Sequence, residues 1–143
     1  MCCTWQFAFT LQFSYVPYID KNGIFVSNHA GNVNDCVITA WDCLPAISDA
    51  VGEKLTLIAD TGVRRGSDVL KGLALGADIV AVGRATLYGV AAAGEAGATR
   101  ALEILEAEIR RTMAVMGLGQ ISDISRDHIR LPADLPVSGQ ARL

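Results

Sequence analysis

The sequence has few of the residues that build metal centres. Of its 143 residues only two are histidines, His29 and His128, and none of its four cysteines belongs to a Cys-x-x-Cys pair. A structural zinc site usually takes about four such ligands at short spacings, so we expect no bound metal. We expect the cysteines to remain reduced thiols, as is usual for a cytoplasmic protein.

Long apolar runs and basic blocks are absent as well. No stretch approaches the ~20 apolar residues that a membrane-spanning helix needs. Residues 2–19 are fairly apolar, but Gln6, Gln12 and Pro17 interrupt them and a basic start is lacking, so they make a poor secretory signal. Lysine and arginine together number 12 against 15 acidic residues, a net charge of −3. We therefore expect a cytoplasmic protein with neither a membrane span nor a nucleic-acid partner.

What is present is an apolar composition typical of one globular domain. Hydrophobic residues make up 51% of the chain and charged residues 19%. Residues 1–22 differ from the rest, because Phe7 to Tyr15 alternate between apolar and polar side chains, which predicts a half-buried strand followed by a turn. We interpret residues 1–22 as a divergent N-terminal segment that could supply an edge strand.

From Gly23 onward, short apolar runs alternate with helical patterns. Strands are predicted at Gly23–Ser27, Lys54–Ala59 and Ile79–Val82. Helices are predicted at 40–51, 68–75, 85–93 and 98–116. Thr39, answered by Asp42, is the expected N-cap of the first helix and Gly52 its end. Gly66 or Ser67 should begin the second helix.

The C-terminal third is predicted to be helical and then turn-rich. Gly94 and Gly97 should break the chain before the longest helix, whose apolar residues share one face. That face consists of Ala101, Leu102, Leu105, Ile109, Met113 and Met116. Residues 122–129 suggest a short helical piece with His128 exposed, and residues 131–143 a loose tail.

The order of these elements predicts the fold class. Strands that alternate with helices give an α/β protein with a parallel sheet. Three such units fit either a piece of a closed eight-stranded barrel, which normally needs ~250 residues, or a small open sheet.

Two glycine-arginine segments predict a phosphate site. The turn at Asp60–Gly66 follows the second predicted strand, and Gly83 and Arg84 follow the third. Consecutive parallel strands end at the same edge of a sheet, so these segments should lie side by side. Free amides at helix N-termini and guanidinium groups are how proteins grip a phosphate. The alternative is that the arginines are ordinary solvated surface residues.

Several spaced motifs carry a family resemblance. The chain contains GIFVSNHAG, then LTLIADTGVRRGSD, then DIVAVGRATLYGVAAAGEAG. In this it resembles the FMN-dependent 2-hydroxy acid dehydrogenases and oxidases, the family of L-lactate dehydrogenase, (S)-mandelate dehydrogenase and glycolate oxidase. The resemblance covers residues 23–130. It implies a TIM barrel of which this chain holds the last three βα units and the C-terminal helices, and an FMN cofactor.

The resemblance also implies roles for individual residues. The implied FMN contacts are Ser27, Asp60, Thr61, Gly62, Val63, Arg64, Gly83 and Arg84. His29 matches the catalytic histidine, which removes a proton from the substrate while a hydride equivalent passes to the flavin. Imidazole suits this role because it can accept a proton near neutral pH. The implied reaction oxidises a lactate- or mandelate-like 2-hydroxy acid to the 2-oxo acid.

The chain departs from the family pattern at several places. Asn32 replaces the arginine that clamps the substrate carboxylate, and Ala30 replaces a glycine. The family's lysine after strand five, the aspartate that orients the histidine and a second carboxylate-binding arginine have no counterpart before Gly23. These departures leave an alternative open, in which the chain is a truncated, non-catalytic remnant that binds FMN or phosphate or only associates with another chain. Whether it forms a homo-oligomer is also left open.

Overall fold

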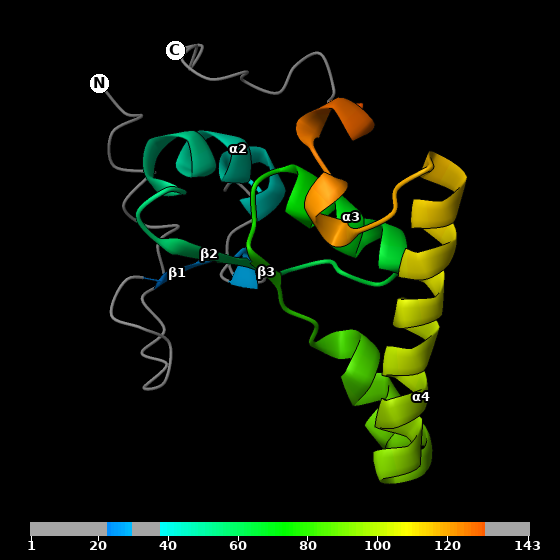
Figure 1. The fold of residues 1–143 in the computed structure, drawn as a ribbon. Coiled ribbons are helices and arrows are strands. Elements are labelled where there is room, and N and C mark those ends of the chain that lie inside the picture. The colour runs from blue at the N-terminus through cyan, green and yellow to red at the C-terminus, as the bar shows by residue number, and fades with distance from the viewer. Residues whose placement is uncertain (1–22, 30–37, 131–143) are drawn as a thin grey trace.

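The computed structural model of the chain describes residues 23–29 and 38–130. Strands and helices alternate along them and end in two short 3-10 helices (Figure 1). In chain order the elements are β1 (Gly23–Val26), α2 (Ala40–Val51), β2 (Thr56–Ala59), α3 (Gly66–Ala74), β3 (Ile79–Val80), α4 (Arg84–Met116), η2 (Ile121–Asp123) and η3 (Arg126–His128). The predicted strand at 7–15 and its turn, Ala30, Asn32 and the tail at 131–143 lie outside the described residues.

The three strands form one parallel sheet in the order β1-β2-β3, which confirms the predicted α/β arrangement. Each strand is shorter than predicted. β2 begins at Thr56 because the amides of Lys54 and Leu55 donate to the Val51 carbonyl, at 2.9 and 3.0 Å, and close the turn that follows α2. The sheet is therefore short, and the adjoining turns fix where its strands begin and end.

Helix α2 begins as the sequence predicts. The Thr39 hydroxyl accepts a hydrogen bond from the Asp42 amide at 3.2 Å and donates to the Asp42 carboxylate at 2.6 Å. This cap satisfies one of the amides that a helix start leaves without a partner. Pro45 is the sixth helical residue, past the first turn, so it lacks the amide that would otherwise donate to the Trp41 carbonyl, and the helix continues through it. Gly52 follows the last helical residue, as predicted.

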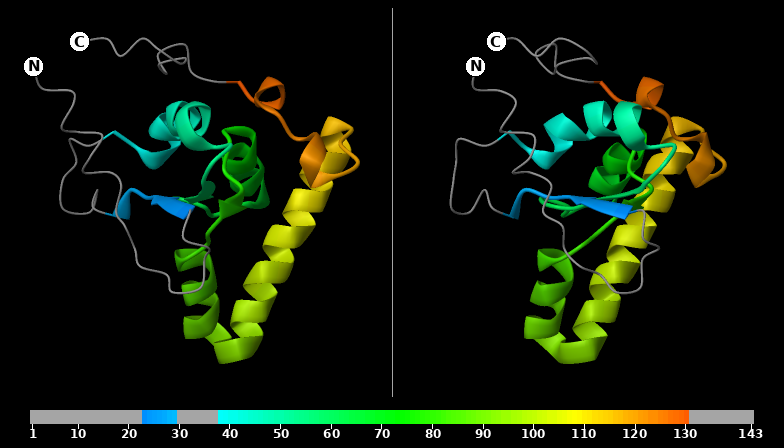
Figure 2. Two further views of the ribbon diagram at one scale, coloured as in Figure 1. Left: turned by 60° about the vertical axis from the view of Figure 1, so that its left-hand side comes forward. Right: turned by 90° about the vertical axis from the view of Figure 1, so that its left-hand side faces the viewer.

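Helix α4 is two helices joined at a kink. Ala93 and Gly94 depart from helical geometry, and Gly94 has a φ of +59°, so the predicted break there is confirmed. The predicted break at Gly97 is wrong, because Gly97 lies within the second helix and packs against Gly89 of the first. A Cβ on either glycine would overlap the backbone of the other. The two halves therefore fold back as a hairpin that projects away from the sheet (Figures 1 and 2).

The core lies between the sheet and α2. Its largest fully buried side chains are Leu44, Leu57 and Val26, and they belong to a buried cluster with Ala40, Ala59, Leu75 and Ala77. In α4 only Leu105 is buried, and Leu102 of the predicted buried face is 53% exposed. The second half of α4 packs on α3, where Gly66 faces the backbone of Leu105 and Ile109. No helix in the described ranges is long and apolar enough to cross a membrane.

The predicted helical piece at 122–129 consists of the two 3-10 turns η2 and η3. Side chains compete locally for the backbone: the Asp123 carboxylate accepts from the Gln120 amide at 3.0 Å, and His128 Nδ1 accepts from the Ser125 amide at 3.1 Å. Such bonds favour short turns over a continuous helix. Arg126 then ties η3 to α2, where its guanidinium group contacts Asp49 at 2.8 Å. His128 is exposed, as predicted.

Candidate functional site

The carboxyl ends of the three strands meet at one edge of the sheet, because the strands run in the same direction. The ladder continues past the strands themselves. The Asp60 amide donates to the Val26 carbonyl at 3.2 Å, and the Ala81 amide donates to the Ala59 carbonyl at 2.8 Å. The segments that leave this edge together are 27–29, 60–65 and 81–84. The predicted site residues among them thus start from neighbouring backbone positions.

A strained turn follows β2. Thr61 and Gly62 both have a φ of +79°, a conformation that is easy for glycine and costly for a β-branched threonine. Three hydrogen bonds hold Thr61 there. Trp41 Nε1 donates to its carbonyl at 2.7 Å, and its hydroxyl accepts from the Asn28 amide at 2.9 Å and donates to the Asp60 carboxylate at 2.7 Å. Strain of this kind persists only where the surroundings enforce it, and it is common at functional sites.

Trp41 was missed by sequence reasoning as a site residue. Its helical spacing indicates a core residue, and it does pack against the buried cluster. Its indole N–H is what links α2 to the turn, and a half-buried indole N–H usually finds an acceptor. Thr61 in turn bridges the end of β1 to the end of β2. The network joins the histidine segment and the turn after β2 into one unit.

The segment after β1 carries an enclosed acceptor without a donor. The His29 amide donates to the Ser27 hydroxyl at 3.2 Å, and the His29 side chain is exposed. The side-chain oxygen of Asn28 is buried and accepts no hydrogen bond from the described residues. An unsatisfied buried acceptor costs about 1–3 kcal/mol. The position therefore suits a ligand that brings an N–H group to this edge.

The N-terminus of α3 is occupied by the protein's own carboxylates. The Asp68 carboxylate accepts from the amides of Arg64 and Arg65 at 3.2 and 3.1 Å, and the Glu108 carboxylate accepts from the Gly66 amide at 2.7 Å. Glu108 also contacts the Arg65 guanidinium group at 3.4 Å. The expectation of free amides at this helix start is therefore wrong.

The ionisation of Asp68 follows from these contacts. Partial burial alone would raise its pKa, but the hydrogen bonds from the Arg64 amide, from Lys71 and from the Arg65 amide outweigh burial. The net result is that the pKa of Asp68 is lowered below its ordinary value. The carboxylate form that closes the helix start is thus the favoured one.

The N-terminus of α4 is open by contrast. Gly83 is its N-cap without a side-chain cap, and the Thr86 hydroxyl donates to the Gly83 carbonyl at 2.8 Å. In the described part of the chain, no group accepts from the amides of residues 84–86. A Cβ at Gly83 would meet nothing within 4 Å. Free amides, the helix dipole and clear space are what an anion needs at a helix start.

The arginines at this edge fall into two classes. Arg64 and Arg84 are exposed and form no ion pair with a described residue, whereas Arg65 is engaged by Glu108.

The side chain of Val63, a predicted FMN contact, is only 5% exposed and packs inward. Val63 can therefore offer only its main chain to a ligand at this edge.

A separate hollow lies away from the strand ends. It has a volume of about 470 Å³ and lies between α2, α3, the C-terminal end of α4 and the turns that follow it. Residues that line it include Trp41, Leu70, Leu75, Met116 and Ile129. None of the predicted site residues lines it, so hollow and strand-end edge are distinct features of the described structure.

Comparison with known proteins agrees with the motifs. The family model of FMN-dependent dehydrogenases matches residues 18–131. L-lactate dehydrogenase of Xanthobacter autotrophicus is 46% identical over 121 residues, which are 85% of this chain and 31% of that enzyme. L-lactate dehydrogenase of Pseudomonas aeruginosa is 48% identical over 108 residues, which are 76% of this chain and 28% of that enzyme.

Solved structures give the same answer. A chimera of (S)-mandelate dehydrogenase superposes with a TM-score of 0.72 at 43% identity, over 76% of this chain and 30% of that one. A flavocytochrome b2 variant with pyruvate bound superposes with a TM-score of 0.69 at 34% identity, over 79% of this chain and 32% of that one. The chain thus spans about a third of the length of these relatives. It belongs to the FMN-dependent dehydrogenase family.

Proposed function

We propose that this chain provides the phosphate-holding and proton-accepting part of an enzyme that oxidises a small 2-hydroxy acid with FMN. The substrate would be a lactate- or mandelate-like acid, and the product the 2-oxo acid. The observation that carries the proposal is the meeting of three strand ends at one edge, with His29, Arg64 and the open start of α4 leaving from it. Relatives named L-lactate dehydrogenase and (S)-mandelate dehydrogenase support it.

The residues at this edge fit FMN. Its phosphate would be held by the amides at the start of α4 with Gly83 and Arg84, and by Arg64 from the neighbouring turn. Asp60, Thr61, Gly62 and Val63 would line the cofactor through the turn after β2. The enclosed Asn28 oxygen fits the N–H group that a flavin ring carries, and the Ser27 hydroxyl, which already accepts from the His29 amide, retains a proton to donate.

His29 is the proposed proton acceptor. Its side chain is exposed at the edge, so a substrate in this position could reach it. Bound FMN supplies the acceptor for the hydride equivalent. His29 takes the substrate's proton in the same event, because the 2-oxo product forms only when both leave. The hydrogen bond from the His29 amide to Ser27 fixes the backbone that carries the imidazole.

Asn32 is the proposed substrate contact and favours a second candidate function. An amide there can donate hydrogen bonds to a substrate carboxylate, but it lacks the charge and the paired donors of arginine. A weak carboxylate clamp supports the alternative that the chain binds FMN or phosphate without turning substrate over. Loss of a charge-assisted contact costs about 1.5–3 kcal/mol of binding.

The proposal also assigns the parts of the chain. Residues 23–130 would be the last three βα units of a TIM barrel with its C-terminal helices, residues 1–22 a separate segment with an edge strand, and residues 131–143 a tail. The sequential order β1-β2-β3 with parallel strands supports this assignment.

We also propose a cytoplasmic location, which cell fractionation tests. We propose a homo-oligomeric assembly of the whole protein, which light scattering tests.

Flavin binding and turnover test the proposal. FMN is titrated into the purified chain while flavin fluorescence is followed, and the flavin-loaded protein is then mixed anaerobically with L-lactate or L-mandelate. We expect fluorescence to change on binding and the yellow colour to bleach with the preferred acid. Binding without bleaching would favour the second candidate. Unchanged fluorescence, together with a colourless protein, would exclude FMN as the ligand of this edge.

A further inference from the structure

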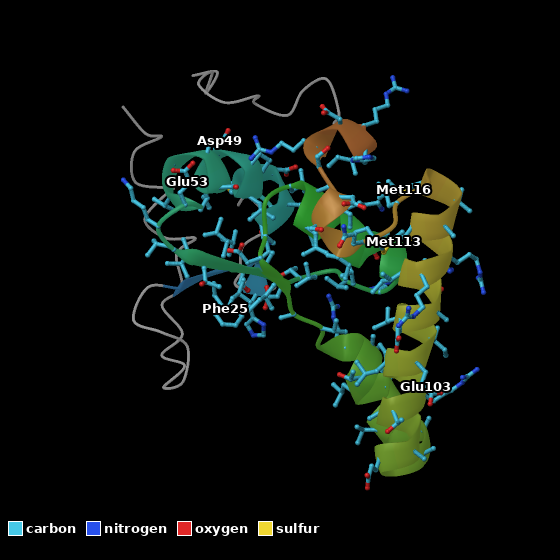
Figure 3. All side chains as sticks on the ribbon, in the orientation of Figure 1. Phe25, Asp49, Glu53, Glu103, Met113 and Met116 are labelled. Carbon is cyan, nitrogen blue, oxygen red and sulfur yellow. The ribbon has the colours of Figure 1, made fainter. Side chains whose placement is uncertain are left out.

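The hollow away from the strand ends is lined mostly by apolar side chains. Its volume of about 470 Å³ lies within the range of about 300–1,000 Å³ that is usual for small-molecule sites. Leu70 and Leu75 of α3 are 3% and 5% exposed and form part of its floor. In Figure 3, Met116 lies at the end of α4 nearest the C-terminal turns. The apolar side chains of the described lining are Trp41, Leu70, Leu75, Met116, Ile124 and Ile129.

Specific contacts hold the walls of the hollow in place. The Arg126 guanidinium group contacts Asp49 at 2.8 Å and donates to the Pro45 carbonyl at 3.1 Å, which fixes the last turn to α2. On the other side, the Glu108 carboxylate accepts from the Gly66 amide at 2.7 Å, which fixes α4 to α3. A ligand would therefore enter a cavity that is already formed, and binding would not have to order its walls.

Donor groups of positive or neutral charge lie among the apolar side chains. Arg130 is exposed and forms no ion pair with a described residue. Because His128 Nδ1 accepts from the Ser125 amide at 3.1 Å, the neutral ring carries its proton on Nε2, which remains a donor. Lys71 contacts Asp68 at 3.1 Å through one N–H group and keeps the others. Arg130, His128 and Lys71 all line the hollow, so its polar lining favours an anion.

One carboxylate belongs to the described lining, that of Asp42. It accepts a hydrogen bond from the Thr39 hydroxyl at 2.6 Å, so it is engaged at the start of α2. The neighbouring Trp41 donates its N–H to the Thr61 carbonyl, and so it offers the hollow only its apolar ring. The hollow thus combines an apolar interior with more cationic than anionic groups.

We propose that the hollow binds a small amphipathic carboxylate. Its apolar chain or ring lies against Trp41 and Met116, and its carboxylate is bound by Arg130 and His128. A guanidinium group suits this role because it offers paired N–H donors to the two carboxylate oxygens. A bare phosphate would gain nothing from the apolar walls, and an uncharged hydrocarbon would gain nothing from the arginine. None of the residues assigned to FMN lines the hollow, so the inference does not rest on the proposed function.

Octanoate is the probe for the first test. Trp5 lies outside the described residues, and Trp5→Phe leaves Trp41 as the sole tryptophan. We expect saturable octanoate binding that shifts Trp41 fluorescence to shorter wavelength, because an apolar chain replaces water beside the ring. Octanol is the matched control and should bind about tenfold more weakly, because it lacks one charge-assisted contact. Calorimetric titration of the unmodified chain with both compounds repeats the comparison without the tryptophan substitution.

Two substitutions, each with a matched control, locate the ligand. Arg130→Gln changes an exposed side chain, so the chain should fold, as circular dichroism verifies, and octanoate should bind about tenfold more weakly. Arg111→Gln, at an exposed position of α4 that does not line the hollow, should change nothing. Met116→Glu places a carboxylate in the hollow and should abolish octanoate binding by repulsion. Val115→Glu adds the same charge one residue earlier, at an 84% exposed position, and should leave binding unchanged.

The outcomes separate this inference from the proposed function. Saturable octanoate binding that Arg130→Gln weakens and Val115→Glu retains supports the inference, whether or not the chain binds FMN. Excess FMN should leave the octanoate affinity unchanged, and displacement by FMN would overturn the assignment of a separate site. Absence of saturable binding overturns the inference, and a hollow filled by residues 131–143 of the chain itself would give that result. Equal affinity for octanoate and octanol overturns it too.

Discussion

Two turns that look alike in sequence differ sharply in structure. Each follows a strand, each contains glycine and arginine, and each precedes a helix. At the start of α3 the amides are taken by Asp68 and Glu108, whereas at the start of α4 the described residues leave them free. A glycine-arginine motif before a helix therefore predicts an anion site only when no carboxylate of the protein already fills it.

Replacing Gly66 and Gly83 by alanine should give the largest difference in stability between the two turns. Gly66→Ala would place a Cβ 2.5 Å from the Ile109 amide nitrogen and 2.7 Å from the Leu105 carbonyl oxygen, both backbone atoms of α4. We expect a loss of about 1–3 kcal/mol in the free energy of unfolding, the usual cost of overpacking. Gly83→Ala is the matched control, because its Cβ meets nothing within 4 Å. Urea unfolding of both variants makes the measurement, and equal losses would contradict the described packing of α3 on α4.

Removing one arginine from each turn should show that the two turns differ in their contribution to FMN binding. Arg84→Gln takes away a guanidinium group from the open helix start, and we expect FMN affinity to fall about 10- to 100-fold, the value of a charge-assisted contact. Arg65→Gln is the matched control, because that side chain is already engaged by Glu108. FMN titrations compare the two, and an equal effect would argue against a distinct role for Arg84.

The turn after β2 should depend on the Trp41 hydrogen bond. Trp41→Phe keeps an aromatic ring in the core but removes the N–H that donates to the Thr61 carbonyl at 2.7 Å. We expect a loss of about 1 kcal/mol in unfolding free energy and faster amide exchange at Asn28, whose amide donates to Thr61. Tyr88→Phe, on a 67% exposed side chain, should change neither. If amide exchange at Asn28 is unchanged in Trp41→Phe, the turn does not depend on the Trp41 hydrogen bond.

The smallest expected effect concerns the pH dependence of the closed turn. Because folding lowers the pKa of Asp68, its carboxylate stabilises the fold above the carboxyl's ordinary pKa, and that contribution is lost as pH falls through the lowered value. Asp68→Asn should therefore cost about 0.5–1 kcal/mol at neutral pH. The difference from the unmodified chain should shrink in acid. Unfolding curves at several pH values test this, and a difference that grows as pH falls would reverse the assigned sign.

Sequence periodicity predicted the elements well where local chemistry decides them. The Thr39 cap and the break at Gly94 follow from residue types and short spacings, and both are observed. The break assigned to Gly97 failed because that glycine serves a contact with Gly89, eight residues earlier in the chain. A glycine needed for close approach looks the same in sequence as one needed for a turn.

The sequence predicted which strand ends form the site, but it could not predict the contacts there between residues far apart in the chain. The predicted order of parallel strands already placed His29, Arg64 and Arg84 at one edge of the sheet. The closure of α3 by Glu108 involves residues 42 positions apart, and the Trp41 bond to Thr61 spans 20. No local pattern reports such pairs. They decide which helix start is free and how the turn after β2 is held.

The most direct test of the account compares FMN with riboflavin, which lacks the phosphate. If the start of α4 with Arg64 and Arg84 grips the phosphate, the chain should bind FMN at least about tenfold more tightly than riboflavin, as one charge-assisted contact is worth that much. The ratio should fall toward one in Arg84→Gln and persist in Arg65→Gln. Equal affinity of the unmodified chain for both flavins would contradict the phosphate site on which the account depends.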